Sequence, residues 1–94
     1  MRKLFTTVHF PEADAGIPYF EIRGNKVYAA EMHPQGKTPQ PWFEITGQFV
    51  YPTDYFGRGH SSLPWFEIRH GGVYATVFHP DGPSPLPWFE MGEE

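Results

Sequence analysis

Four glutamates occupy the same place in a motif that the chain writes four times. The motif reads PYFEI at residues 18–22, PWFEI at 41–45 and 64–68, and PWFEM at 87–91, and its glutamates are Glu21, Glu44, Glu67 and Glu90. Two carboxylates about 5 to 9 Å apart can perform acid–base chemistry on a glycosidic bond. Glu21 with Glu67, or Glu44 with Glu90, would need that separation across the molecule. A small enzyme using paired glutamates is therefore one hypothesis.

Two histidines form a second candidate for chemistry. His33 and His79 each precede a proline, in HPQG and HPDG, and stand 46 residues apart. Two histidines supply at most half of a zinc shell, and a histidine before proline in a turn usually caps or packs. They are weak metal candidates, and His9, His60 and His70 add no cluster. The chain has no cysteine, phosphate loop, nucleophile elbow or HExxH motif. The sequence predicts no metal and no cofactor.

The glutamates also have a structural interpretation. Each could accept hydrogen bonds from a facing tyrosine hydroxyl, an indole N–H or backbone amides, or pair with Arg23 or Arg69. Phe5, which we expect opposite Glu90, has no hydroxyl, so a Glu–Tyr pair is not the whole explanation. A third interpretation is that rings and carboxylates together bind a sugar, an amine or a cationic side chain.

The elements that position these residues follow from a period of 23. Pro18, Pro41, Pro64 and Pro87 begin successive copies, and a fixed period indicates a repeat architecture. We predict one domain over 1–94, with repeats 18–40, 41–63 and 64–86 and a split repeat formed by 87–94 and 1–17. The N-terminal strand then pairs with the C-terminal one, and the termini meet where the other copies have a turn.

Each repeat predicts a β-hairpin. The aromatic and β-branched PWFEI segment is followed by a glycine turn and a Val-Tyr segment. Gly24-Asn25 and Gly47-Gln48 fit a type II′ turn, whereas His70-Gly71 has its glycine second and predicts a different turn. A two-residue loop sets Ile22 opposite Val27 and Glu21 opposite Tyr28. No helical periodicity occurs. The predicted fold is all-β, with four hairpins closed around a pseudo-four-fold axis.

Alternation along the strands predicts two faces. The core face carries Leu4, Phe20, Ile22, Val27, Phe43, Ile45, Val50, Phe66, Ile68, Val73, Phe89 and Met91. The other face combines rings with carboxylates, and its candidate ligand-binding residues are Tyr19, Trp42, Trp65, Trp88, Glu21, Glu44, Glu67, Glu90, Tyr28, Tyr51 and Tyr74, with Phe5 in the closing copy. So many large rings on one face of a small domain must be covered by something.

The repeated aromatic-x-Ile, glycine turn, Val-Tyr pattern covers nearly the whole chain. In this pattern the chain resembles the small hairpin-repeat proteins called four-fold beta-flower domains, although PWFEI and the His-Pro turns depart from the expected spelling. The resemblance implies a fold and no function.

Composition excludes several classes of protein. The formal net charge is −4 with seven Lys plus Arg spread along 94 residues, so there is no basic stripe for nucleic acid. No apolar run is long enough for a membrane span or a signal peptide, which predicts a cytoplasmic protein. We predict a small non-catalytic module whose ring-and-carboxylate face binds a partner subunit, a partner protein or a small ligand. A purely structural homo-oligomer and a small enzyme using paired glutamates or histidines remain alternatives.

Overall fold

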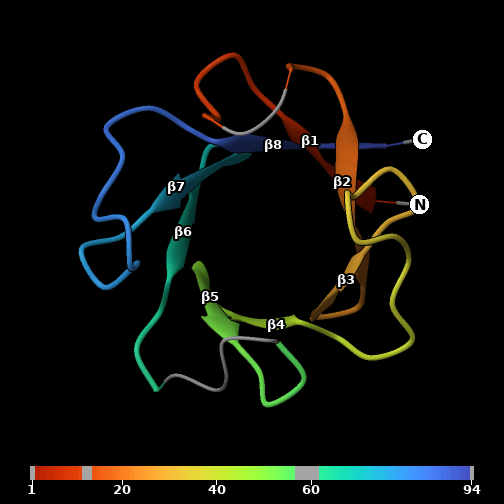
Figure 1. The fold of residues 1–94 in the computed structure, drawn as a ribbon. Coiled ribbons are helices and arrows are strands. Elements are labelled where there is room, and N and C mark those ends of the chain that lie inside the picture. Colours follow the sequence, from red (N-terminus) through yellow and green to blue (C-terminus); the bar gives the residue numbers. More distant parts are fainter. Residues whose placement is uncertain (1, 12–13, 57–61, 94) are drawn as a thin grey trace.

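The chain folds into a closed antiparallel barrel of eight strands joined in sequence order (Figure 1). The structure is a computed structural model and describes residues 2–11, 14–56 and 62–93. The strands are β1 (Arg2–Thr6), β2 (Pro18–Arg23), β3 (Lys26–Ala29), β4 (Phe43–Thr46), β5 (Phe49–Pro52), β6 (Phe66–Arg69), β7 (Gly72–Ala75) and β8 (Phe89–Glu93). The described residues contain no helix long and apolar enough to cross a membrane.

Three tight hairpins have the predicted register. Ile22 pairs with Val27 and Glu21 with Tyr28, and β4–β5 and β6–β7 repeat this pairing one and two periods later. Gly24 and Gly47 have φ of 62° and 64°, as the first residue of a type II′ turn requires. His70 has φ 51° and Gly71 φ 80°, the pattern of a type I′ turn. The predicted difference in turn type is confirmed.

The fourth hairpin is assembled from the two ends of the chain. β1 pairs with β8 so that Leu4 lies opposite Met91 and Arg2 opposite Glu93, and the N and C labels lie on the same side of the ring in Figure 1. The prediction that the terminal strands pair is therefore confirmed. Because β1 also pairs with β2, this seam leaves the sheet without a free edge.

The interior holds the predicted core. Leu4, Ile22 and the three valines are buried, as are the four phenylalanines of the repeated motif. Ile45, Ile68 and Met91 are partly buried against them. All twelve predicted core residues thus face inward, because inward and outward side chains alternate along each strand.

The two ends of the barrel differ. One end holds the three short hairpin turns, the start of β1 and the end of β8. The other end holds the four long connections that join β1 to β2, β3 to β4, β5 to β6 and β7 to β8. Tyr19, Trp42, Trp65 and Trp88 lie at this second end, at or just before the starts of β2, β4, β6 and β8. The candidate pocket is built there.

Candidate functional site

The tyrosine and tryptophans of the motif lie apart from the glutamates. Tyr19 and Trp65 are buried in the core cluster, and Trp42 and Trp88 pack against it. All four line one pocket at the end of the barrel that carries the long connections. The expectation of a single shared face is wrong for these four residues. Strand alternation does not decide the side of the three tryptophans, because β4, β6 and β8 begin one residue after them. Tyr19 lies within β2, but the β1–β2 register shifts between Phe20 and Pro18, so alternation is interrupted at this residue as well.

The floor of this pocket is a closed set of four phenyl rings, Phe20, Phe43, Phe66 and Phe89. Neighbouring rings have centroids 5.5–6.3 Å apart and planes inclined by 77–86°. This edge-to-face arrangement is favourable for aromatic pairs. We call these four residues the phenylalanine floor.

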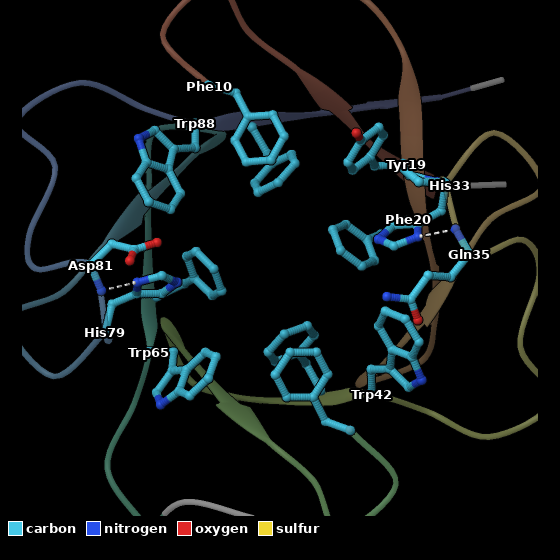
Figure 2. A pocket seen from close by; sticks show the side chains of 15 residues that line it. Phe10, Tyr19, Phe20, His33, Gln35, Trp42, Trp65, His79, Asp81 and Trp88 are labelled. Atoms are coloured by element: carbon cyan, nitrogen blue, oxygen red, sulfur yellow. Dashed lines mark hydrogen bonds between the residues drawn. The ribbon is translucent and has the colours of Figure 1, made fainter. Parts of the chain in front are cut away.

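Above the floor, further rings follow one another around the mouth of the pocket (Figure 2). Each tyrosine or tryptophan lies between one phenylalanine and one histidine, with centroids 4.9–5.8 Å apart and planes inclined by 58–89°. We call this closed series the aromatic collar: Phe10, Tyr19, His33, Trp42, Phe56, Trp65, His79 and Trp88.

Half of the collar was missed as a site in the sequence, although the period contained the signal. Phe10, His33, Phe56 and His79 stand 23 residues apart and so share one position in the repeat. The sequence predicted the two histidines to be turn residues that cap or pack, and offered them as weak metal or catalytic candidates, but did not group them with Phe10 and Phe56. In the structure they lie on opposite sides of the pocket (Figure 2). The described residues contain no cluster of three or more groups that could hold a metal ion.

The backbone fixes each tryptophan from both sides. The N–H of Trp42 donates to the carbonyl of Val27 in the preceding hairpin at 2.9 Å, and its own carbonyl accepts from the N–H of Thr53 at 2.9 Å. The Thr53 hydroxyl also donates to the carbonyl of Pro41 at 2.5 Å. Trp65 and Trp88 have the same set of bonds, made by Thr76 and Thr7. The repeated threonine therefore positions the collar.

The histidines are held by their own turns. Gly36 N–H donates to the carbonyl of His33 at 2.8 Å, which closes the HPQG turn, and the N–H of Gln35 donates to His33 Nδ1 at 3.1 Å. His79 accepts the same bond from Asp81 at 3.0 Å. A neutral imidazole whose Nδ1 accepts a hydrogen bond carries its proton on Nε2. Both rings thus have a defined tautomer and orientation.

The pocket has a volume of about 290 Å³. Its lining is aromatic apart from Pro34, Gln35 and Asp81, and the last two occupy equivalent positions in the two His-Pro turns at the rim. Four of the described lining residues are ionisable: the two histidines, Tyr19 and Asp81. Asp81 is the only carboxylate among them. The site combines a rigid apolar wall with one carboxylate.

Along their strands, the four glutamates alternate with residues that face the core. Three of them, Glu21, Glu44 and Glu67, accept hydrogen bonds from polar side chains. Lys26 Nζ donates to Glu44 at 2.6 Å from the adjacent strand. Gln48 Nε2 donates to Glu67 at 2.7 Å. No side chain among the described residues donates to Glu90, which is exposed. Gly71 stands at the position that Gln48 holds in the preceding repeat, so the fourth glutamate lacks the amide donor.

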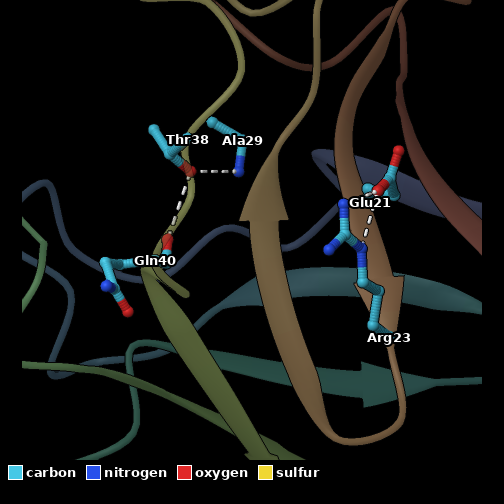
Figure 3. Close-up of polar contacts among 5 residues, drawn as sticks. All are labelled: Glu21, Arg23, Ala29, Thr38 and Gln40. Carbon is cyan, nitrogen blue, oxygen red and sulfur yellow. Dashed lines mark hydrogen bonds and ion pairs between the residues drawn. The ribbon is translucent and has the colours of Figure 1, made fainter.

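Glu21 is the most buried of the four, with a side chain only 11% exposed. Arg23 Nε and Nη2 donate to Glu21 Oε1 at 2.9 and 2.8 Å (Figure 3). These hydrogen bonds hold the pKa of Glu21 below its usual value, and burial opposes them. Hydrogen bonding to Lys26 likewise lowers the pKa of Glu44. The proposed pairing with arginine is thus found at Glu21, and Arg69 lies 3.6 Å from Glu67.

Among the described residues, Tyr28, Tyr51 and Tyr74 do not donate to the glutamates that they face, so the tyrosine alternative is not found at these positions. Tyr28 instead lies under the guanidinium of Arg23, 4.7 Å from it, and Tyr74 lies 4.1 Å from that of Arg69. The register brings each tyrosine opposite its glutamate, but the arginine two residues along covers the ring. Beside Tyr51, Thr46 stands at the position that Arg23 and Arg69 hold in the other repeats.

The carboxylate pairs considered for catalysis are not brought together. β2 and β6, which carry Glu21 and Glu67, are four strands apart in a ring of eight, as are β4 and β8 with Glu44 and Glu90. Each pair thus stands on opposite sides of the barrel with the core between them. His60 lies outside the described residues.

Comparison of the chain with protein-family models, with curated proteins and with solved structures finds no match. The resemblance to beta-flower domains stays a prediction.

Proposed function

We propose that this protein is a small non-catalytic binding module, and that its binding site is the pocket framed by the aromatic collar. The observation that carries this proposal is the closed ring of eight aromatic side chains around a volume of about 290 Å³. Concave, mostly apolar pockets with a few polar groups are the usual form of small-ligand sites. Of the predicted ligand-binding residues, Tyr19 and the three tryptophans belong to this site.

We further propose that the barrel is a pseudo-four-fold assembly of the 23-residue repeats. The equal spacing of the floor and collar residues supports this arrangement. The alternation of phenylalanine and histidine in the collar lowers the symmetry of the pocket toward two-fold. A ligand would therefore meet two chemically different pairs of walls.

The positions of the ionisable groups favour binding over catalysis. An acid–base pair of carboxylates must meet at one substrate, but Glu21 and Glu67, like Glu44 and Glu90, lie on opposite sides of the barrel. Glu21 and Glu44 each have a cationic side chain as a partner, and hydrogen bonds to these cations lower their pKa values. These glutamates act as structural groups of the sheet.

A ligand screen monitored by tryptophan fluorescence tests the proposal. A bound ligand should change the emission of Trp42, Trp65 and Trp88 and raise the melting temperature by mass action. The blocking variant Gln35→Trp places a large ring at the exposed rim, and it should abolish these effects without unfolding the chain. The matched control is Gln48→Trp, on an exposed turn away from the pocket. Ligands that bind the blocked variant and the wild type equally would refute the proposal.

A second candidate function, docking of a partner protein or of a second copy, has its own support. Among the described residues the exposed large apolar side chains all lie in the four long connections around the pocket: Val8, Met32, Tyr55, Leu63, Val77, Phe78 and Leu86. Exposed apolar groups gathered at one end mark interaction surfaces. This end would then serve as an interface.

The solution mass, measured by light scattering across a dilution series, tests whether a second copy docks at this end. Self-association through this end should be weakened by Phe78→Ser, which changes an exposed side chain. Thr46→Ser, at the opposite end of the barrel, is the control. A mass equal to that of one chain at every concentration would exclude self-association and leave the pocket open for a ligand.

A further inference from the structure

The shape of the pocket restricts the ligand that it could bind. Adjacent rings of the aromatic collar are inclined by 58–89°, and those of the phenylalanine floor by 77–86°. Rings of the collar that contact rings of the floor are inclined by 40–75°. No two neighbouring rings therefore lie in one plane, and the pocket offers no extended flat surface. A compact, rounded group can contact several rings of different inclination at once. The volume of about 290 Å³ is also at the lower end for ligand pockets.

The charges around the pocket restrict the ligand further. Among its described lining residues there is no lysine and no arginine, and Asp81 supplies a carboxylate at the rim. His33 and His79 each accept a backbone N–H at Nδ1, so each neutral imidazole contributes a ring without a positive charge. Together with a formal net charge of −4, this environment disfavours anions.

We propose that the pocket binds an alkylated ammonium group, which contacts the tryptophan and phenylalanine rings and has Asp81 as its counter-charge. Aromatic cages bind quaternary ammonium groups through the ring quadrupole, most strongly where tryptophan contributes. The group could belong to a small molecule or to a trimethylated lysine of a partner protein. This inference rests on the function proposed above and adds the ligand class.

Choline and its neutral isostere 3,3-dimethylbutan-1-ol separate charge from shape, because a carbon replaces the charged nitrogen. Binding is followed by tryptophan fluorescence and by the indole N–H resonances of the three tryptophans. We expect choline to bind about five- to thirtyfold more tightly than the isostere. A peptide with trimethyllysine, compared with the same peptide carrying unmodified lysine, distinguishes a protein source of the ammonium from a small molecule.

Asp81 and its equivalent Gln35 form a matched pair for testing the counter-charge. Asp81→Asn should weaken choline binding about two- to fivefold and leave the isostere unaffected, and Gln35→Glu should strengthen choline binding by a similar factor. Asp54→Asn removes the same charge from an exposed position that does not line this pocket, and it should change neither affinity by as much.

The outcomes separate this inference from the proposed function. If the isostere binds as tightly as choline, the ammonium inference is overturned, while the pocket remains a ligand site. An equal effect of Asp54→Asn and Asp81→Asn would overturn the role of Asp81. If neither choline, the isostere nor either peptide changes the indole resonances, the ammonium inference fails, and only the broader screen with Gln35→Trp decides the proposed function.

Discussion

Replacing Glu21 by glutamine should destabilise the protein at neutral pH, whereas the same change at Glu90 should have little effect. Glu21 accepts two hydrogen bonds from Arg23 on one oxygen, at 2.9 and 2.8 Å, and its side chain is 11% exposed. Such charge-assisted bonds contribute about 1.5–3 kcal/mol when shielded from water and less at a surface. Because the Arg23 side chain is 48% exposed, we expect Glu21→Gln to cost about 1 kcal/mol.

Urea unfolding at several pH values measures this cost and its origin. With an m-value of about 1.4 kcal/mol/M, the midpoint at pH 7 should fall by about 0.7 M. The folded pKa of Glu21 is lowered, so its contribution is present above the unfolded pKa and is lost as the pH falls through the folded pKa. The difference between wild type and Glu21→Gln should therefore disappear in acid.

Glu90→Gln is the internal control, since it removes the same charge from an exposed member of the same repeat position. Its free energy of unfolding should stay within about 0.5 kcal/mol of wild type. Equal destabilisation by the two variants would mean that the repeated carboxylate acts through net charge, and the assignment of Glu21 to a local ion pair would be refuted. A difference that persists below the folded pKa would refute it as well.

Three further predictions concern the floor, the third turn and the threonine that positions the collar. Phe43→Ala should cost about 3–5 kcal/mol, against less than about 0.5 for the exposed Phe78→Ala, and equal urea midpoints would contradict a packed phenylalanine floor. His70→Asn should raise the melting temperature by about 2–4 °C, because asparagine tolerates the φ of 51° better than histidine; a decrease would mean that the histidine has another role. Thr53→Val should cost about 1–2 kcal/mol and shift tryptophan emission, because it removes the hydroxyl bond to Pro41, and unchanged emission would mean that the collar is positioned without it.

The fold was largely predictable because the repeat gives the same local information four times. The glycine turns determine which residues of paired strands lie opposite each other. Because side chains alternate between the two faces, this register then determines which twelve residues face inward. The pairing of Leu4 with Met91 was also predictable, since the two half-repeats at the ends of the chain complete each other only if those strands meet.

The site was predictable only in part. Strand alternation placed Trp42 on the side of Glu44, but Trp42 precedes the strand, where the connections bend and alternation no longer decides direction. The collar partners Phe56 and His79 depend on the path of these long connections, which no local rule determines. Their common position in the repeat was visible in the sequence, and it was the one signal that could have grouped them.

The seam between β1 and β8 has a consequence for the order of events during folding. Three hairpins are local and can form as soon as their residues leave the ribosome, but Leu4 meets Met91 only after 87 further residues have been made. Closing a loop of that length costs about 4 kcal/mol of chain entropy. Until then β1 and its neighbours form an open sheet with two unpaired edges, and edges of this kind recruit other chains. The protein is thus most prone to aggregation before β8 pairs with β1.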